Sequence, residues 1–293
     1  MPRLKHHPLK RTFTKEEIAN YYDHTEVHYR RFWKLDESMG LHYGVWEPGI
    51  SNLAQAIKNT NVRLARLGKV QRGERVLDAG CGVGGSSIYL AAEYGCRASG
   101  ITLSSRQVDR ATGYAAKAGL AHLVNFSCQD YTRTNFDDNT FDLVWAIESM
   151  QTAIDKAAFL REMKRVLKPN GRILIADVFK HGQWQIEDSP LMQTMLGGWA
   201  MSDILSVEEL DEEARKFGMH IAASEDVSRQ IVPSIKRIYW ASLAGMIGTK
   251  WYNLFHNATY FSKIHYKTGL AQYKAWKQGL WGYHLIEIKN QPS

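Results

Sequence analysis

The chain has 293 residues, of which 44% are hydrophobic and 23% charged, and it carries a formal net charge of +7. This length allows one large α/β domain with an added cap, and the composition excludes a disordered or fibrous chain. The excess positive charge lies in the stretch Arg3 to Lys15 and on scattered helix faces. Because no basic segment is interleaved with aromatic residues, we expect no nucleic-acid partner.

Three cysteines are present, without the Cys/His spacings of a zinc site, so we expect no metal. Their small, odd number fits a reducing, cytoplasmic location. The N-terminus lacks the apolar segment of a signal peptide, and no stretch nears the ~20 apolar residues of a membrane span. We therefore expect no membrane span; the oligomeric state, including a homo-oligomer, stays open.

In chain order, a loose basic tail over residues 1–13 is followed by an aromatic N-terminal helix, for which Thr14 is a suitable N-cap. A turn-rich linker over 40–49 leads into a helix over 51–67 with an apolar stripe. Strands then alternate with helices, which predicts a doubly wound α/β core with a parallel sheet covered on both faces. The core strands are expected at 75–77, 97–102, 124–127, 141–147 and 172–178.

The pattern changes beyond residue 179. Residues 180–278 have a mostly helical pattern and many aromatic residues, which predicts a helical substrate cap. Residues 279–293 alternate again and are expected to return to the sheet as its final strand. We therefore divide the chain into a lead-in that closes the site (1–50), a core (51–179), the inserted cap and the last strand.

The strongest local signal is the glycine-rich turn Val76-Leu77-Asp78-Ala79-Gly80-Cys81-Gly82-Val83-Gly84-Gly85. Its glycines let the backbone approach a ligand, and the helix that follows offers free N–H groups. The Gly-x-Gly-x-x-Gly spacing from Gly80 also matches a dinucleotide site. Asp78, however, places a carboxylate where a pyrophosphate would sit, and the second strand ends at Thr102 without the acidic residue that an NAD ribose needs. A ligand with an ammonium group suits this turn better.

VLDAGCGVGG (76–85) resembles the first motif of class I S-adenosylmethionine-dependent methyltransferases. The likeness continues, in the family's order and spacing, through GITLSSRQ (100–107), SCQDY (127–131), FDLVWAIESM (141–150) and LREMKRVLKPNGRILIAD (160–177). GITLSSRQ, at the predicted second strand, resembles the corresponding segment of the tocopherol, sterol and cyclopropane-fatty-acid groups. The resemblance implies a seven-stranded, mostly parallel, Rossmann-like sheet and S-adenosylmethionine as the cofactor.

The resemblance also implies which residues bind the cofactor. They are Asp78, Gly80 and Gly82 at the methionine end, Thr102, Leu103 and Gln107 at the ribose, Asp130 and Tyr131 at the adenine, and Ile147 beside the sulfonium. Many relatives carry an acidic residue near Thr102, so here Thr102 and Gln107 would have to serve the ribose. Plain core packing is the alternative role for Tyr131 and Ile147.

The segment IANYYDHTEVHYRRFWKLDESMGLHYGVWEPG (18–49) resembles the lead-in of the tocopherol, sterol side-chain and geranyl diphosphate methyltransferases. In that group an aromatic helix closes over the cofactor. The resemblance implies that Tyr21 and Tyr43 bind the cofactor and that Tyr22 and His42 belong to the catalytic group. A structural role is the alternative for His42.

Residues 148–152 bear on the kind of acceptor. Tocopherol-type O-methyltransferases resemble ESxEHMPD here, whereas this chain has Thr152 at the histidine position, which weakens the case for deprotonating a phenol. Methylation of an alkene instead leaves a carbocation, which a carboxylate and aromatic faces stabilise. Glu148 is the predicted catalytic carboxylate, with a salt bridge or a helix cap as its alternative role.

We therefore expect methyl transfer to a lipophilic small molecule, in the first place to a carbon of an isoprenoid, with a prenyl diphosphate among the candidate substrates. The aromatic residues of the predicted cap fit an apolar pocket. O-methylation of a phenol or quinol and N-methylation of a small amine are the alternatives. A cofactor-binding protein without transferase activity, such as a cyclase derived from the fold, is a remote one.

Overall fold

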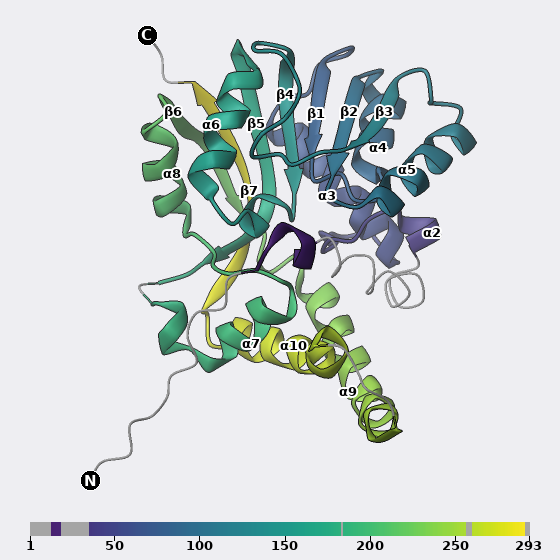
Figure 1. Ribbon diagram of the computed structural model, residues 1–293, viewed down its shortest axis with the longest axis vertical. Coiled ribbons are helices and arrows are strands. Elements are labelled where there is room, and N and C mark those ends of the chain that lie inside the picture. Colours follow the sequence, from purple (N-terminus) through teal and green to yellow (C-terminus); the bar gives the residue numbers. More distant parts are fainter. Residues whose placement is uncertain (1–12, 19–34, 183, 256–259, 291–293) are drawn as a thin grey trace.

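The computed structural model describes residues 13–18, 35–182, 184–255 and 260–290. Within them, seven strands form one sheet in the order β3-β2-β1-β4-β5-β7-β6 (Figure 1). Their bounds are Arg75–Ala79 (β1), Arg97–Thr102 (β2), Val124–Cys128 (β3), Phe141–Ile147 (β4), Leu167–Lys180 (β5), Met219–Asp226 (β6) and Trp281–Asn290 (β7). Strands β1 to β5 are parallel, and β7 runs antiparallel between β5 and β6. The predicted doubly wound, mostly parallel sheet is confirmed.

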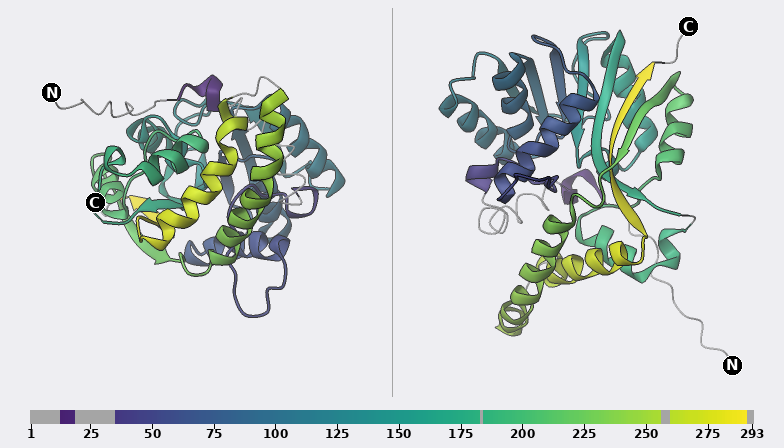
Figure 2. Two further views of the ribbon diagram at one scale, coloured as in Figure 1. Left: turned by 90° about the horizontal axis from the view of Figure 1, so that it is seen from below. Right: turned by 180° about the vertical axis from the view of Figure 1, so that it is seen from behind.

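Helices cover both faces of the sheet (Figures 1 and 2). On one face lie α3 (Leu53–Leu67), α4 (Gly85–Tyr94) and α5 (Ser105–Lys117); on the other lie α6 (Lys156–Val166) and α8 (Val207–Arg215). Successive side chains of a strand point to opposite faces. Accordingly, Val76 and Trp145 join the buried cluster that contains Leu64 of α3, whereas Leu77 and Val144 join the cluster of α6 and α8.

The cap consists of α7 (Pro190–Gly198), α9 (Val232–Phe255) and α10 (Tyr260–Lys277), at the carboxyl ends of the parallel strands (Figure 1). Met192 and Met195 of α7 and Ala271 of α10 belong to the same buried cluster as Trp145 of β4. The cap and one face of the sheet therefore share a single hydrophobic core. In the described part of the chain, no helix is long and apolar enough to cross a membrane.

Strand β6 lies inside the stretch 180–278 that the sequence pattern assigned to a helical cap. That assignment is wrong for residues 206–226, because α8 and β6 complete the outer edge of the sheet. Leu210 and Ala214 of α8 are buried against the core, while β6 is a half-exposed edge strand that ends in polar residues. An edge strand of this kind lacks the continuous apolar run by which the central strands are recognised.

Near the start of the described residues, a short helical turn covers residues 15–18. Thr14 caps it, as predicted. The Glu17 backbone N–H donates to Thr14 Oγ1 at 3.2 Å, and the Thr14 N–H donates to Glu17 Oε2 at 3.0 Å, which is a capping box. Figures 1 and 2 show this turn between the carboxyl edge of the sheet and the cap. Most of the predicted aromatic helix lies outside the described residues.

Candidate active site

The glycine-rich turn joins β1 to α4 and presses against the end of β4. Gly80 has φ of +90°, and a Cβ added to it would lie 2.4 Å from the Cβ of Ser149. The N–H groups of Gly80 and Cys81 both donate to the Ile101 carbonyl, at 3.0 and 2.9 Å, which ties the turn to β2. Only glycine accepts both this backbone conformation and this close approach. Gly82 is also left-handed, with φ of +52°, and a Cβ there would meet only Leu41, at 3.8 Å.

Asp78 provides a buried carboxylate at the start of this turn. It is 2% exposed, and its Oδ2 accepts a hydrogen bond from Ser87 Oγ at 2.7 Å. Burial raises the pKa of Asp78 to about 6, although the hydrogen bonds from Ser87 oppose the shift. A cationic group of a ligand would favour the ionised form. The cradle and the carboxylate together fit the ammonium end of S-adenosylmethionine.

The predicted ribose residues gather at the end of β2. Thr102 Oγ1 donates to Gln107 Oε1 at 2.5 Å, and both side chains are buried. The Gln107 N–H donates to Ser104 Oγ, the N-cap of α5, at 3.2 Å. Leu103 is half-buried and packs against a small cluster formed by Phe13 and other residues. The structure brings these three predicted residues together, and their contacts with a ribose remain predictions.

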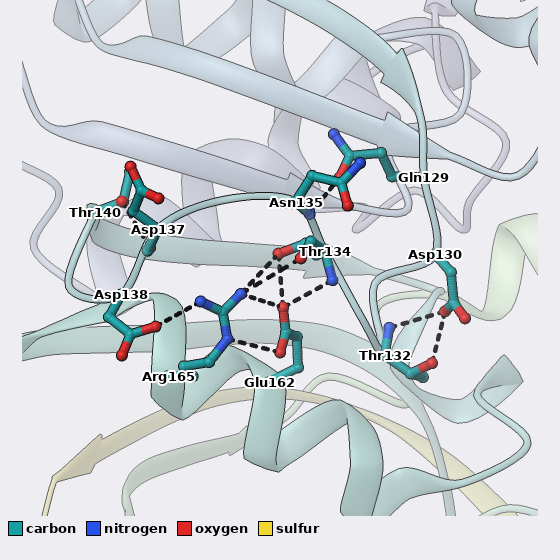
Figure 3. Close-up of polar contacts among 10 residues, drawn as sticks. All are labelled: Gln129, Asp130, Thr132, Thr134, Asn135, Asp137, Asp138, Thr140, Glu162 and Arg165. Atoms are coloured by element: carbon teal, nitrogen blue, oxygen red, sulfur yellow. Dashed lines mark hydrogen bonds and ion pairs between the residues drawn. The ribbon is translucent and has the colours of Figure 1, made fainter.

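Asp130 lies just beyond β3, where the adenine is expected. Its Oδ1 accepts hydrogen bonds from the backbone N–H and the hydroxyl of Thr132, both at 2.8 Å (Figure 3), and it forms an ion pair with Lys15 of the lead-in. Burial alone would raise the pKa of Asp130, but Lys15 and Thr132 hold it below its ordinary value. The carboxylate is therefore ionised and able to accept a further hydrogen bond, as the adenine prediction requires.

The loop that follows Asp130 is fastened to α6. The N–H and the hydroxyl of Thr134 both donate to Glu162 Oε1 at 2.7 Å, and Arg165 donates to the same oxygen at 2.6 Å (Figure 3). Arg165 also donates to Asp138 at 2.6 Å. Charge-assisted hydrogen bonds of this kind are the strong ones, so the loop has a defined position beside the expected adenine.

For Tyr131 and Ile147, the alternative to a cofactor contact is plain core packing. The Tyr131 hydroxyl donates to the Ser149 carbonyl at 3.0 Å, and its ring meets Phe159 edge-on with the centroids 5.4 Å apart. Ile147 is half-buried at the end of β4. Core packing accounts for the position of Tyr131, and a cofactor contact of either residue remains a prediction.

Glu148 directly follows β4 and is held from two sides. Its Oε1 accepts from the Tyr43 backbone N–H at 2.6 Å and from the Tyr283 hydroxyl at 2.9 Å. Its φ is +48°, a left-handed conformation that costs a non-glycine residue about 1–3 kcal/mol. Strained residues of this kind cluster at functional sites, so the backbone adds to the case for Glu148.

The surroundings of Glu148 disfavour its charge. Burial raises its pKa to about 8, the hydrogen bond from the Tyr43 N–H opposes this, and the negative charge of Asp177 adds to it. Asp177 is fully buried, and burial raises its own pKa to about 7, against hydrogen bonds from the N–H groups of Gln151 and Val178. A carboxylate with a pKa near neutrality suits proton transfer.

Three aromatic residues surround Tyr43, whose N–H donates to Glu148. The Tyr43 ring lies 6.1 Å from that of Trp199, 5.9 Å from that of Trp281 and 5.7 Å from that of Tyr283, measured between centroids. The Tyr43 hydroxyl donates to Gln272 Oε1. These rings come from the lead-in, the cap and β7, so the side of the site around Glu148 is apolar.

The remaining predicted residues come from the lead-in. His42 is 7% exposed, and its Nδ1 lies 2.9 Å from the Tyr43 carbonyl oxygen, to which it can donate. Burial lowers the pKa of His42 to about 4, against that hydrogen bond, so the ring is neutral at neutral pH. This geometry fits the structural alternative, and catalysis by His42 stays a prediction. Tyr21 and Tyr22 lie outside the described residues.

The sequence pattern did not single out Tyr283, Asp177 or Gln272 for this site. Tyr283 contacts Glu148 from β7, a strand that the pattern predicted without assigning a function to any of its side chains. The alternation along Trp281–Asn290 was a usable signal, because it places Tyr283 on the same face of the sheet as Trp281 and Leu285. Gln272 of α10 belongs to the cap, where no sequence pattern predicts which residues meet the sheet.

Comparisons with known proteins show which family the chain resembles. The family model described as "Methyltransferase domain" matches residues 77–175. The chain is 33% identical over 223 residues to methyltransferase GfsG of Streptomyces halstedii, covering 74% of this chain and 78% of that protein. It is 31% identical over 202 residues to the 27-O-demethylrifamycin SV methyltransferase of Amycolatopsis mediterranei, covering 68% and 74%. The crystal structure of the cyclase SpnF shares the fold, with a TM-score of 0.79, 24% identity and coverage of 96% and 98%.

Proposed function

This chain belongs to the class I S-adenosylmethionine-dependent methyltransferases, and from that premise we propose that it methylates a lipophilic small molecule, with a carbon of an isoprenoid as the first acceptor to test. Transfer of a methyl group from S-adenosylmethionine to a small molecule is its general activity. Its acceptor is the part that we infer from the site.

Bound S-adenosylmethionine supplies a methyl carbon that the positive charge of its sulfonium activates. In our proposal, the Asp78 carboxylate and the turn at Gly80 hold the methionine end, and Asp130 orients the adenine. Because the methyl carbon is already activated, the main task of the protein is alignment, which can remove up to about 7–11 kcal/mol of a barrier. The rigid glycine turn and the fastened Asp130 loop suit this task.

The single observation that carries the acceptor proposal is the position of Glu148 between Tyr43 and Tyr283. If an alkene attacks the methyl carbon, its π electrons would form the new C–C bond while the methyl–sulfur bond breaks and S-adenosylhomocysteine leaves, and the neighbouring alkene carbon would become cationic. The Glu148 carboxylate stabilises that charge and then takes a proton from an adjacent carbon, which restores a double bond. A base with a pKa near neutrality is suited to that step.

The surroundings of Glu148 support an apolar acceptor. Tyr43, Trp281 and Tyr283 are almost fully buried, and Trp199 is half-buried beside them. Aromatic faces attract cations, and an apolar wall keeps water from a reactive intermediate. Thr152, at the position of the histidine in tocopherol-type enzymes, donates to the Ser149 carbonyl at 2.6 Å and is nearly buried, so it supplies no base.

O-methylation is the second candidate, and a relative favours it. The protein from Amycolatopsis mediterranei carries an O-demethyl substrate in its name and is 31% identical to this chain. In this case Glu148 would take the proton of a hydroxyl group as its oxygen attacks the methyl carbon. The two candidates thus share the base and differ in the atom that is methylated.

An acceptor panel with mass detection tests the proposal. The full chain is incubated with S-adenosylmethionine carrying a labelled methyl group and with prenyl diphosphates, sterols, quinols, hydroxylated macrocycles and small amines. We expect one labelled methyl group on a carbon of an isoprenoid, located by fragmentation. Label on oxygen would establish the second candidate, and label on nitrogen or on no acceptor would contradict both.

A further inference from the structure

A second group of polar side chains lies away from the glycine turn, where β5, β6 and β7 meet the cap. We propose that His181, Asp226 and His284 form a binding site for a divalent transition-metal ion, with zinc as the first candidate. The proposal is independent of the acceptor and of Glu148. It rests on geometry that the three residues reach only in the folded chain.

The three side chains converge on one point. Each offers one ligand atom, and these atoms all lie within 4.8 Å of one another. The Nε2 atoms of His181 and His284 are 3.0 Å apart. Two nitrogens bound to one zinc at about 2.0–2.1 Å stand roughly 3.0–3.4 Å apart, so the imidazole pair already has the spacing of neighbouring ligands. An oxygen of the Asp226 carboxylate lies within the same 4.8 Å and completes the set.

The strands hold these residues in place. Asp226, the last residue of β6, lies opposite His284 in the register of β6 and β7. His181 directly follows β5, and its N–H donates to the Leu280 carbonyl at 3.0 Å. Between the two histidines, β7 carries Gly282, where an added Cβ would lie 2.4 Å from His181 Nε2. The absence of a side chain at this position leaves room for the His181 ring to lie across β7 and reach His284.

The carboxylate is oriented by its own partners. Asp226 Oδ1 accepts from the N–H of Ser228 at 2.8 Å and from its hydroxyl at 2.5 Å, and the Tyr283 N–H donates to Ser228 Oγ at 2.8 Å. Hydrogen bonds of this kind fix a ligating carboxylate in metal sites. Ser228 therefore links the carboxylate to β7, the strand that carries His284.

The donor set defines the class of ion. Two imidazoles and one carboxylate are typical ligands of Zn²⁺ and of other first-row transition metals, with water completing the coordination. The His181 and His284 nitrogens now share a hydrogen bond, and an ion would replace the shared proton. Asp226 is exposed and the histidines are half-buried, so the site can be reached from solvent.

A bound ion would tie together β5, β6 and β7 at the ends where the chain passes between the sheet and the cap. The chain leaves the sheet for α7 after His181 and for α9 after Asp226, and it returns from α10 into the strand that carries His284 (Figure 1). The three ligands thus lie at three of the connections between the described sheet and the cap. Their distance from one another in the chain explains why no sequence spacing predicted a metal.

Titration with metal alone tests the site. The full chain, without any affinity tag, is titrated with ZnCl₂ by calorimetry and with CoCl₂ by visible absorption. We expect one ion per chain and a tetrahedral or five-coordinate cobalt spectrum. His181→Gln and His284→Gln should each weaken affinity at least tenfold, and Asp226→Asn should weaken it less. Zinc should raise the Tm of the wild type more than that of Asp226→Asn, and least that of the two histidine variants.

Two controls separate this site from other histidines. His122→Ala removes an exposed histidine elsewhere, and a double variant of His6 and His7 removes the pair near the N-terminus; both should bind as the wild type does. Circular dichroism without metal checks that each variant is folded. The proposal is overturned if the wild type binds no stoichiometric ion, if folded His181 and His284 variants bind equally well, or if the N-terminal double variant alone loses binding.

Discussion

Glu148 combines features that packing alone does not favour. Its backbone is left-handed, its carboxylate is desolvated, and a second buried carboxylate, Asp177, stands close enough to raise its pKa. Tyr43 and Tyr283 each direct one hydrogen bond to its Oε1. This arrangement keeps a carboxyl group oriented at the end of β4, and the structural alternatives considered for Glu148, a salt bridge or a helix cap, do not describe these contacts.

The pKa of Glu148 predicts how activity depends on pH. Because only the carboxylate accepts a proton, kcat/KM should rise with pH and level off above about 8. Initial rates across this range, in the wild type and in Asp109→Asn as a control at an exposed position of α5, measure the profile. A profile that is flat from pH 6 to 9 would rule out Glu148 as the base.

Stability should change in the opposite direction. The folded-state pKa of Glu148 lies above the ordinary 4.5, so between 4.5 and about 8 the folded protein binds the extra proton and loses stability as the pH rises. Glu148→Gln removes this cost. In thermal melts above pH 8, the variant should therefore have a higher Tm than the wild type. A gain of 1 kcal/mol in unfolding free energy corresponds to about 2–4 °C, and we expect at least this shift. An equal or lower Tm would contradict the assigned burial.

Asp78 carries the clearest cofactor prediction. Asp78→Asn keeps the shape of the side chain but removes the charge, and hydrogen bonds to charged groups contribute about 1.5–3 kcal/mol. We expect the Kd for S-adenosylmethionine to rise roughly tenfold to a hundredfold. Calorimetry measures it, and Asp137→Asn, on the loop after β3, serves as the matched control. Unchanged affinity would show that Asp78 does not bind the ammonium group of S-adenosylmethionine.

Among single residues, the sequence predicted as site residues those that belong to local motifs. Asp78, Gly80 and Glu148 each stand at the end of a strand, where a short pattern fixes their position. Tyr283 and Gln272 reach the site only through the folding of distant segments, and no local pattern specifies such contacts. His42 illustrates the reverse: its sequence position suggested catalysis, whereas burial beside the Tyr43 carbonyl fits a structural role.

Among the elements, the turn between β1 and α4 requires glycine at Gly80 for two reasons, its backbone conformation and the close approach of Ser149. Gly80→Ala would meet both the unfavourable φ and the Ser149 side chain, whereas Gly73→Ala, at φ of +76°, would meet no atom within 4 Å. The control should lose about 1 kcal/mol of unfolding free energy and Gly80→Ala about 2 kcal/mol more. Denaturant melts compare them. Equal losses would show that the contact with Ser149 is not tight.

The strands show why fold prediction succeeded in the centre of the sheet and failed at its edge. Leu143 to Ala146 in the centre of β4 are buried on both faces and form a continuous apolar run, which marks this segment as a strand. Met219–Asp226 is half-exposed and carries His220, Ser224 and Glu225, so its sequence does not differ from that of a polar helix or loop. Its pairing with β7, formed across more than fifty residues of chain, determines its structure.

In the whole molecule, the cap and the core share one hydrophobic cluster. Met195→Ala in α7 should therefore destabilise the entire protein by about 2–5 kcal/mol, the usual range for a buried methionine, and leave a single unfolding transition. Lys277→Ala, at an exposed position of α10, should change little. Calorimetric unfolding distinguishes the cases. Two separate transitions would mean that the cap folds as an independent unit.

The most direct test of the central claim compares the wild type with Glu148→Gln in one pair of measurements. Binding of S-adenosylmethionine is measured by calorimetry, and transfer of its labelled methyl group is measured with the acceptor found in the panel. We predict an unchanged Kd and a loss of transfer of at least about a hundredfold, the usual contribution of a positioned base. Undiminished transfer in a variant that binds the cofactor normally would contradict the role assigned to Glu148.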